Sequence, residues 1–262
     1  MDILEALVLG IIQGLTEWLP VSSSGHLVFA QELFDLPAGE NLLFDLMVHL
    51  GTVLAVCVYF RKELWSILAA MASGSGRSER ESKLRRLGVA IVVGTAPIAV
   101  LGLVISDGIE DIFDLRLVGI ALLVNAAVLI LAERLSSERK RDIRLVDALV
   151  IGVFQAVAII PGISRSGFSI SGGMSRGLQR ETAATFAFLL SVPALLGAFA
   201  YGVTTLERYE ADATMLLIGA VAAFAVGLVS IDYLLKAIRG GKLWIFGAYC
   251  VVVGLAAIII TL

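Results

Sequence analysis

Long apolar stretches recur along this chain, and each is about as long as a lipid bilayer is thick. A helix needs about 20 mostly apolar residues to cross the hydrocarbon core of a membrane. Six stretches meet that requirement, at residues 42–60, 84–105, 117–132, 182–203, 214–235 and 243–262. Apolar residues make up 58% of the chain, whereas soluble domains have about 45–50%. The sequence therefore predicts an all-α, multi-pass protein of the cell membrane with six transmembrane helices.

Two further apolar regions, residues 3–35 and 144–178, are interrupted near their middle by polar turns. The first turn reads Pro-Val-Ser-Ser-Ser-Gly from Pro20, and the second reads Pro-Gly-Ile-Ser-Arg-Ser-Gly from Pro161. Proline removes a helix hydrogen bond and glycine loosens the backbone, so each region is predicted to form two helical arms around a non-helical turn. Irregular backbone at membrane depth is tolerated only where protein or a wet cavity surrounds it. The two turns are therefore expected to meet and to share one site.

The two interrupted regions also resemble each other in sequence. When the chain is shifted by 142 residues, 8 of the 23 positions from 5 to 27 are identical. The matched pairs include Gln13 with Gln155, Ser22 with Ser164, Ser24 with Ser166 and Gly25 with Gly167. We predict one integral membrane domain over residues 1–262, built from a first repeat at about 2–133 and a second at about 144–262.

The charges of the loops predict the orientation of the repeats. Basic residues gather in 61–86, 133–144 and 236–242, and acidic residues gather in 107–114 and 207–212. Basic loops belong in the cytoplasm, so the acidic loops lie outside by alternation. The first interrupted region then starts and ends outside, whereas the second starts and ends inside. Each is predicted to be a re-entrant helical hairpin, in an inverted-topology repeat. The Gly- and Ser-rich segment 73–78 is predicted to be a cytoplasmic loop.

The net charge and the cysteines give no support for two other classes of protein, those that bind nucleic acid and those that hold a metal through Cys and His. The formal net charge is -3, which gives no reason to expect a nucleic acid partner. Cys57 and Cys250 each lie in an apolar run, where a thiol acts as a small hydrophobe. No metal motif of the Cys/His type is present in the sequence.

The polar residues of the two turns suggest an anion site, because polar groups in apolar surroundings usually mark function. Each turn leads into a helix whose first N–H groups lack intrahelical partners, which suits a phosphate. Arg165 adds a guanidinium fork that matches phosphate oxygens. Glu17 could hold a divalent cation or act as a general base. His26 could deprotonate a serine, attack phosphorus itself or protonate a leaving group.

Structural roles are open alternatives for the same residues. A serine at a helix start is commonly an N-cap, and a lone histidine near a helix end is commonly a structural hydrogen-bonder. Arg165 and Glu17 could simply pair with each other. His49 has no polar neighbours in sequence, so we predict a structural role for it. Asn125 is isolated within an apolar span, and we expect it to form helix–helix hydrogen bonds.

The motifs resemble those of the undecaprenyl-diphosphate phosphatases, also called bacitracin-resistance proteins. The shared motifs are Gln-x-x-x-Glu at 13–17, Leu-Pro-Val-Ser-Ser-Ser-Gly-His at 19–26 and Pro-Gly-Ile-Ser-Arg-Ser-Gly at 161–167, and the resemblance covers essentially the whole chain. It implies hydrolysis of undecaprenyl or another polyprenyl diphosphate to the monophosphate and phosphate. That reaction recycles the lipid carrier of cell-envelope glycan synthesis and confers bacitracin resistance. The resemblance also implies an active site open to the outer side and a divalent cation, Mg²⁺ or Ca²⁺.

The resemblance also implies roles for individual residues. Glu17, Ser23, His26 and Arg165 match the catalytic positions, with Ser23 at the place of the proposed nucleophile and Glu17 also holding the metal. Whether Ser23 or His26 attacks is left open. Gln13 stands where many members have Glu, and a neutral amide can only support the site by hydrogen bonding. The expected substrate-binding residues are Gln13, Ser22, Ser24, Gly25, Gly162, Ser164 and Ser166.

A transport function is the alternative, because inverted repeats with broken helices are also how many secondary transporters are built. The chain would then be a polyprenyl-phosphate flippase or a small-anion transporter. At the positions matched by the shift of 142 residues, however, Glu17 is replaced by Ile159, Ser23 by Arg165 and His26 by Phe168. This asymmetry favours a single phosphatase site. The expected partners are the polyprenyl diphosphate and membrane lipids; the oligomeric state is open, with a homodimer as one alternative.

Overall fold

Helices account for all the regular elements in the described part of the chain. The computed structural model describes residues 1–36, 42–73, 78–105, 114–205 and 212–261. Six of its helices are long and apolar enough to cross a membrane. They are α3 (Leu42–Tyr59), α5 (Glu79–Ile105), α6 (Leu115–Leu135), α9 (Arg180–Thr205), α10 (Ala213–Arg239) and α11 (Leu243–Ile260). The prediction of an all-helical protein with six transmembrane helices is confirmed. Four helices (α5, α6, α9 and α10) extend beyond the predicted spans, mostly where charged residues continue the helix past the apolar part, whereas α3 and α11 end one and two residues before the predicted ends.

The two interrupted regions form broken helix pairs, as predicted. The first pair is α1 (Ile3–Thr16) and α2 (Ser23–Leu33), and the second is α7 (Leu145–Val157) and α8 (Arg165–Ser175). Asp2 and Glu5 form a capping box that begins α1. The path of each pair through the bilayer stays a prediction, as do the duplication and its inverted topology.

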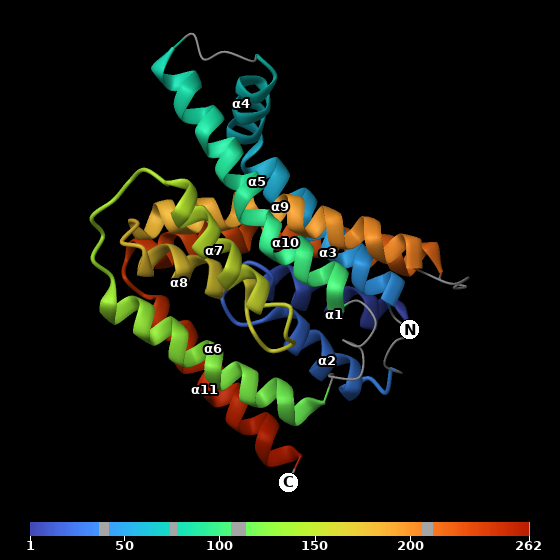
Figure 1. Ribbon diagram of the computed structural model, residues 1–262. Helices are drawn as coiled ribbons and strands as arrows, with labels where there is room; N and C mark the ends of the chain where they lie inside the picture. The colour runs from blue at the N-terminus through green and yellow to red at the C-terminus, as the bar shows by residue number, and fades with distance from the viewer. Residues whose placement is uncertain (37–41, 74–77, 106–113, 206–211, 262) are drawn as a thin grey trace.

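One helix was not predicted, because it lies in a charged region that reads as a loop. This helix, α4 (Arg61–Ala72), lies beside the start of α5 and projects with it from the rest of the bundle (Figure 1). Ile67 and Ala70 are buried against α5. Residues 74–77 of the predicted flexible loop, and residues 106–113 and 206–211 of the predicted acidic loops, lie outside the described residues.

The core is centred on α9. Of the 18 most apolar consecutive residues of α9, 56% are buried, whereas the corresponding share in α5 is 22%. α9 therefore lies inside the bundle and α5 near its edge. Phe188 of α9 packs edge-on against Trp18, with ring centroids 5.3 Å apart. Large apolar side chains such as Val104 and Ile260 are exposed on the outer faces of the bundle, as expected of surfaces that contact lipid.

Helices of the first half pack on helices of the second half. α1 packs on α10, α7 packs on α5, and α6 pairs with α11 at one side of the bundle (Figure 1). Glycines permit two of these contacts, since a Cβ at Gly10 would overlap the carbonyl of Gly219 and a Cβ at Gly152 would overlap that of Gly94. Gly10 and Gly152 are equivalent under the shift of 142 residues, so the two broken pairs are anchored by the same kind of contact.

Candidate active site

The two polar turns meet, as predicted from sequence. Ser166 donates a hydrogen bond to the carbonyl of Leu19 over 3.3 Å. Asn125 of α6 joins both turns, because its amide donates to the carbonyl of Pro20 at 2.9 Å and accepts from the N–H of Ser164 at 3.2 Å. The sequence predicted only a helix–helix role for Asn125. In the structure it fixes the first turn against the second.

The serines at the start of α2 and α8 act as N-caps in the same way. The hydroxyl of Ser22 accepts from the N–H of Gly25 at 3.4 Å, and that of Ser164 accepts from the N–H of Gly167 at 3.2 Å. The two caps nevertheless differ in backbone conformation. Ser22 has a φ of 71°, in the left-handed region that a serine rarely adopts, whereas Ser164 has an ordinary φ of -82°. Backbone strain is therefore confined to the first turn.

Ser24 and Ser166 extend these caps. Their hydroxyls lie 3.3 Å from the hydroxyl of Ser22 and 3.1 Å from that of Ser164, respectively. The glycines of the turns provide room for close packing. Gly162 has a φ of 92°, and a Cβ there would lie 2.6 Å from the carbonyl oxygen of Val118. The structure therefore gives Gly162 a role in building the turn, while its predicted role in substrate binding stays a prediction.

Glu17 is the centre of the polar cluster. It ends α1 and is 7% exposed. Its Oε2 accepts hydrogen bonds from Ser23 Oγ at 2.6 Å and from Gln13 Nε2 at 3.0 Å. Its Oε1 lies 3.8 Å from Nη1 of Arg165. The structure therefore brings together three of the four predicted catalytic residues, from two turns that are far apart in sequence.

Arg165 has donors to spare beside this carboxylate. Its Nε and Nη1 are buried and have no hydrogen-bond partner among the described residues. The distance of 3.8 Å to Glu17 is too long for a hydrogen bond. A buried donor without a partner costs about 1–3 kcal/mol, so a simple structural pair with Glu17 does not explain this geometry. The guanidinium is suited to an anionic ligand with oxygens at hydrogen-bond distance.

A small cavity lies between the two turns. Its volume is about 40 Å³, and its polar lining consists of Glu17, Ser23, Ser24, His49, Ser164 and Arg165. This is room for roughly three waters. The first residues of α2 and of α8 both line it. The positive ends of two helix dipoles are therefore directed at one small polar cavity, which favours an anion there.

His49 lines this cavity although the sequence predicted a structural role for it. Its Nε2 lies 3.7 Å from Oε2 of Glu17. Its Nδ1 lies 2.7 Å from the carbonyl of Asp45, which can only accept, so the ring carries a proton on Nδ1. The polar partner of His49 lies on another helix and is not visible from the local sequence. The only available signal was a histidine within an apolar span.

His26 lies apart from the cavity. Its Nδ1 is 2.7 Å from the carbonyl of Ser22, and its Nε2 is 2.8 Å from the hydroxyl of Tyr249. Its ring stacks on that of Tyr249, with centroids 5.6 Å apart. Both ring nitrogens are thus engaged away from Ser23, whose hydroxyl bonds to Glu17 instead. The role of His26 as base or nucleophile stays a prediction, and the sequence did not indicate Tyr249.

The donor set around Glu17 limits how a divalent cation could bind. Among the described residues, no group of three or more His, Cys, Asp or Glu side chains is placed to hold a metal ion. Glu17 supplies one carboxylate and Ser23 one hydroxyl. Mg²⁺ is commonly bound by one or two carboxylates together with substrate phosphates. The residues present therefore fit a cation that shares its coordination with a diphosphate.

Comparison with known proteins agrees with these observations. The family model for bacitracin resistance protein BacA matches residues 6–256. A protein of Korarchaeum cryptofilum named undecaprenyl-diphosphatase is 42% identical over 98% of both chains. Proteins of the same name from Methanosphaera stadtmanae and Carboxydothermus hydrogenoformans are 39% and 40% identical, over 100% and 99% of this chain and 99% and 98% of theirs. The chain belongs to the bacitracin resistance protein BacA family.

Proposed function

We propose that this protein is an undecaprenyl-diphosphatase. It hydrolyses undecaprenyl diphosphate in the membrane to undecaprenyl phosphate and inorganic phosphate, which recycles the lipid carrier of cell-envelope glycan synthesis and confers bacitracin resistance. The observation that carries the proposal is the convergence of Ser23, Glu17 and Arg165 on one cavity. Family membership and the names of the relatives support the same reaction.

The second turn and the two helix starts bind the diphosphate. Arg165 donates its unpaired N–H groups to phosphate oxygens, and Ser24 and Ser164 line the same cavity. The N-termini of α2 and α8 add positive potential from two sides. These groups stabilise the negative charge of the substrate, and they stabilise the additional negative charge that develops in the transition state.

Ser23 is the nucleophile and Glu17 its base. The hydrogen bond of 2.6 Å between them supports this assignment over one with His26 as the base. Ser23 Oγ forms a bond to the terminal phosphorus while the bond from phosphorus to the bridging oxygen breaks. Glu17 accepts the hydroxyl proton and passes it to the bridging oxygen as undecaprenyl phosphate leaves. Water then attacks the phosphoserine, Glu17 takes its proton and returns it to Oγ, and phosphate departs.

Other residues hold these two in place. Gln13 and His49 contact the same oxygen of Glu17 that Ser23 contacts. His26 bonds to the carbonyl of Ser22 and so supports the strained cap that begins α2. A divalent cation bound by Glu17 and phosphate oxygens, Mg²⁺ or Ca²⁺, would neutralise charge on the phosphates. By the distribution of basic loops, the site opens to the outer side of the membrane.

Release of phosphate by the purified protein tests the proposal. We expect phosphate release from farnesyl or undecaprenyl diphosphate in detergent, measured with malachite green, and its loss in Ser23→Ala. Ser66→Ala, which removes a hydroxyl from the exposed face of α4, serves as the matched control and keeps full activity. A carrier would move the lipid across proteoliposomes without releasing phosphate, and that result would contradict the proposal.

A further inference from the structure

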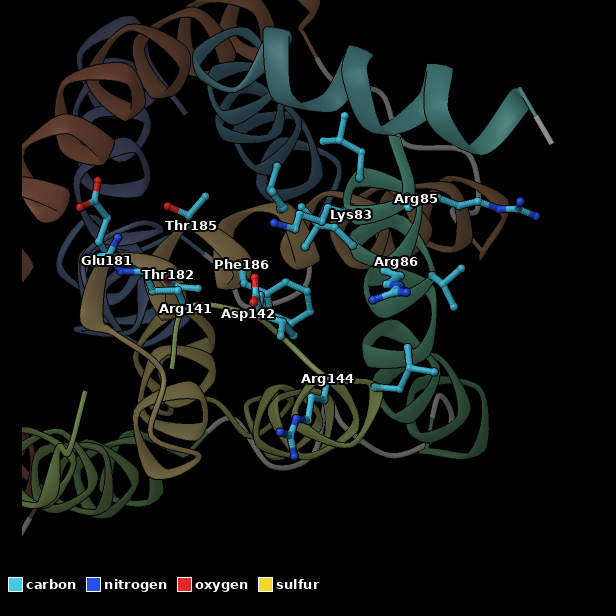
Figure 2. Close-up of a pocket in the computed structure, with 17 residues that line it drawn as sticks. Lys83, Arg85, Arg86, Arg141, Asp142, Arg144, Glu181, Thr182, Thr185 and Phe186 are labelled. Carbon is cyan, nitrogen blue, oxygen red and sulfur yellow. The ribbon is translucent and has the colours of Figure 1, made fainter. Parts of the chain in front are cut away.

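A second, much larger cavity lies at the end of the bundle where the basic loops are found. Its volume is about 980 Å³, within the range of cavities that bind organic ligands. Its walls are the start of α5, the segment 141–145 that leads into α7, and the start of α9 (Figure 2). It shares no lining residue with the cavity at Glu17, so it is a separate site.

Basic side chains dominate the rim of this cavity. Figure 2 shows them on two walls of the cavity, one formed by α5 and one by the segment before α7. They are Lys83, Arg85, Arg86, Arg141 and Arg144, against the acidic Asp142 and Glu181. Glu181 is already paired with Arg239 at 2.5 Å, outside the cavity lining.

Three of the rim cations have no acidic partner within 4 Å in the part of the chain that the structure describes. They are Arg86, Arg141 and Arg144, and they come from two walls of the cavity. Guanidinium groups without an acidic partner at the rim of one cavity attract an anion, and a phosphate matches their fork geometry. The rim therefore favours a ligand with a phosphate group.

The inner part of the cavity is apolar. Phe186 and Leu189 of α9 line it and are 1% and 2% exposed, and Leu87 and the more exposed Val89 of α5 line it as well. The cations thus stand near residue 84, where the apolar span of α5 begins, and the apolar lining continues from there into the span. A water-soluble anion would not gain from contact with the apolar lining, and a neutral lipid would not gain from contact with the cations.

We propose that this cavity binds an anionic diacyl phospholipid. Its phosphodiester group contacts Arg86, Arg141 and Arg144, and its acyl chains lie over Leu87 and Val89. Basic pockets between membrane helices commonly hold anionic headgroups, and each Lys or Arg contributes to the attraction. The site goes beyond the phosphatase function and does not depend on it.

Lipid titration of the purified full-length protein tests the site. Phosphatidylglycerol should raise the thermal unfolding midpoint with a saturable dependence that gives an apparent Kd. The triple variant Arg86→Gln/Arg141→Gln/Arg144→Gln should weaken that Kd on the order of 100-fold. Phosphatidylcholine should give no saturable shift. Glycerophosphoglycerol, which has the headgroup without acyl chains, should give none at the concentrations at which the lipid saturates.

A matched control separates the site from general surface charge. Lys62→Gln/Arg134→Gln/Arg139→Gln removes three cations that do not line the cavity and should leave the Kd unchanged. If the first triple variant does not fold, Arg86→Gln and Arg141→Gln singly should each weaken binding about 5-fold. Equal weakening in both triple variants overturns the proposal, as does a wild-type response to phosphatidylcholine. Saturation by glycerophosphoglycerol at the lipid's own concentrations would instead mark a site for a soluble anion and would also overturn it.

Discussion

The hydroxyl of Ser23 donates a 2.6 Å hydrogen bond to the carboxylate of Glu17, across the break between α1 and α2. If Glu17 accepts the proton of Ser23, then Glu17→Gln should lower the rate of phosphate release by about 10²–10⁴-fold, the usual contribution of a general base. The amide keeps the shape of the side chain, so the protein should elute as the wild type does on size exclusion. A variant with near wild-type kcat would assign the base elsewhere.

Arg165 and Arg176 stand at opposite ends of α8 and provide a matched pair. Arg165→Ala should reduce kcat/KM by about 10²–10³-fold, because it removes the donors proposed to bind the phosphates. Arg165→Lys should fall in between, since an ammonium keeps the charge but not the fork. Arg176 pairs with the buried Asp147 at 2.9 Å, so Arg176→Ala should lower thermal stability while the folded fraction keeps its kcat. Equal kinetic losses in the two alanine variants would contradict the assignment.

The two histidines are expected to differ in their effects. His49 lines the small cavity beside Glu17, so His49→Ala should lower kcat roughly 10-fold through misplacement of the carboxylate. His26 supports Ser22 from outside the cavity, and His26→Ala should lose activity through disorder of the α2 start. The shape of the pH–rate profile separates the roles. If His26 were the base, the residual activity of His26→Ala would no longer fall at low pH. If His26 only positions Ser22, the residual activity should still fall at low pH as in the wild type.

Removal of Asn125 should be costly because it leaves one buried backbone group without a partner and weakens the bonding of another. Asn125→Leu strips the N–H of Ser164 of its hydrogen bond and leaves the carbonyl of Pro20 with only the weak bond from Cys250 Sγ at 3.7 Å. The unsatisfied N–H costs about 1–3 kcal/mol and the lost bond to the carbonyl about 1 kcal/mol, so the expected loss in the free energy of unfolding is about 2–4 kcal/mol. Equilibrium unfolding in detergent measures it, with the surface variant Ser66→Ala expected within about 0.5 kcal/mol of wild type.

Glycine-to-alanine changes test the close contacts between the two halves. Gly10→Ala and Gly152→Ala place a methyl group against the backbone of α10 and α5, and overpacking of this kind costs about 1–3 kcal/mol. Gly102 and Gly197 are the controls, because a Cβ at either has no neighbouring atom within 4 Å. Alanine there should be neutral or stabilise by up to about 1 kcal/mol, since it restricts the unfolded chain. Thermal unfolding of the four variants gives the comparison.

The transmembrane helices were predictable because bilayer thickness alone selects apolar stretches of a given length. The span predicted at 214–235 and the helix α10 (Ala213–Arg239) differ only where the charged residues begin. α4 was not predictable in this way. Its charged residues Arg61, Lys62 and Glu63 lie in its first turn, and its apolar part is shorter than a membrane span. Burial of Ile67 and Ala70 and the contact with α5 accompany the helix.

The candidate site was partly predictable from the sequence. Paired motifs and the cost of irregular backbone in a membrane predicted that the turns would meet, which brings Glu17 to Arg165. Local sequence could not place His49 or Asn125, because their polar partners come from other elements. It also could not orient His26, whose ring is held by Tyr249 of α11.

The packing of each broken pair on the opposite half has a consequence for how the protein is made. α1 is synthesised well before α10, the helix that covers its glycine face, and helices α2 to α9 lie between them. Residues 1–36 must therefore stay associated with the membrane or with the insertion machinery without their final neighbour until α10 has been translated. Maturation of the first polar turn is thus a late event in biogenesis, and a chain that stops after α6 leaves the helix before Glu17 without its main packing partner.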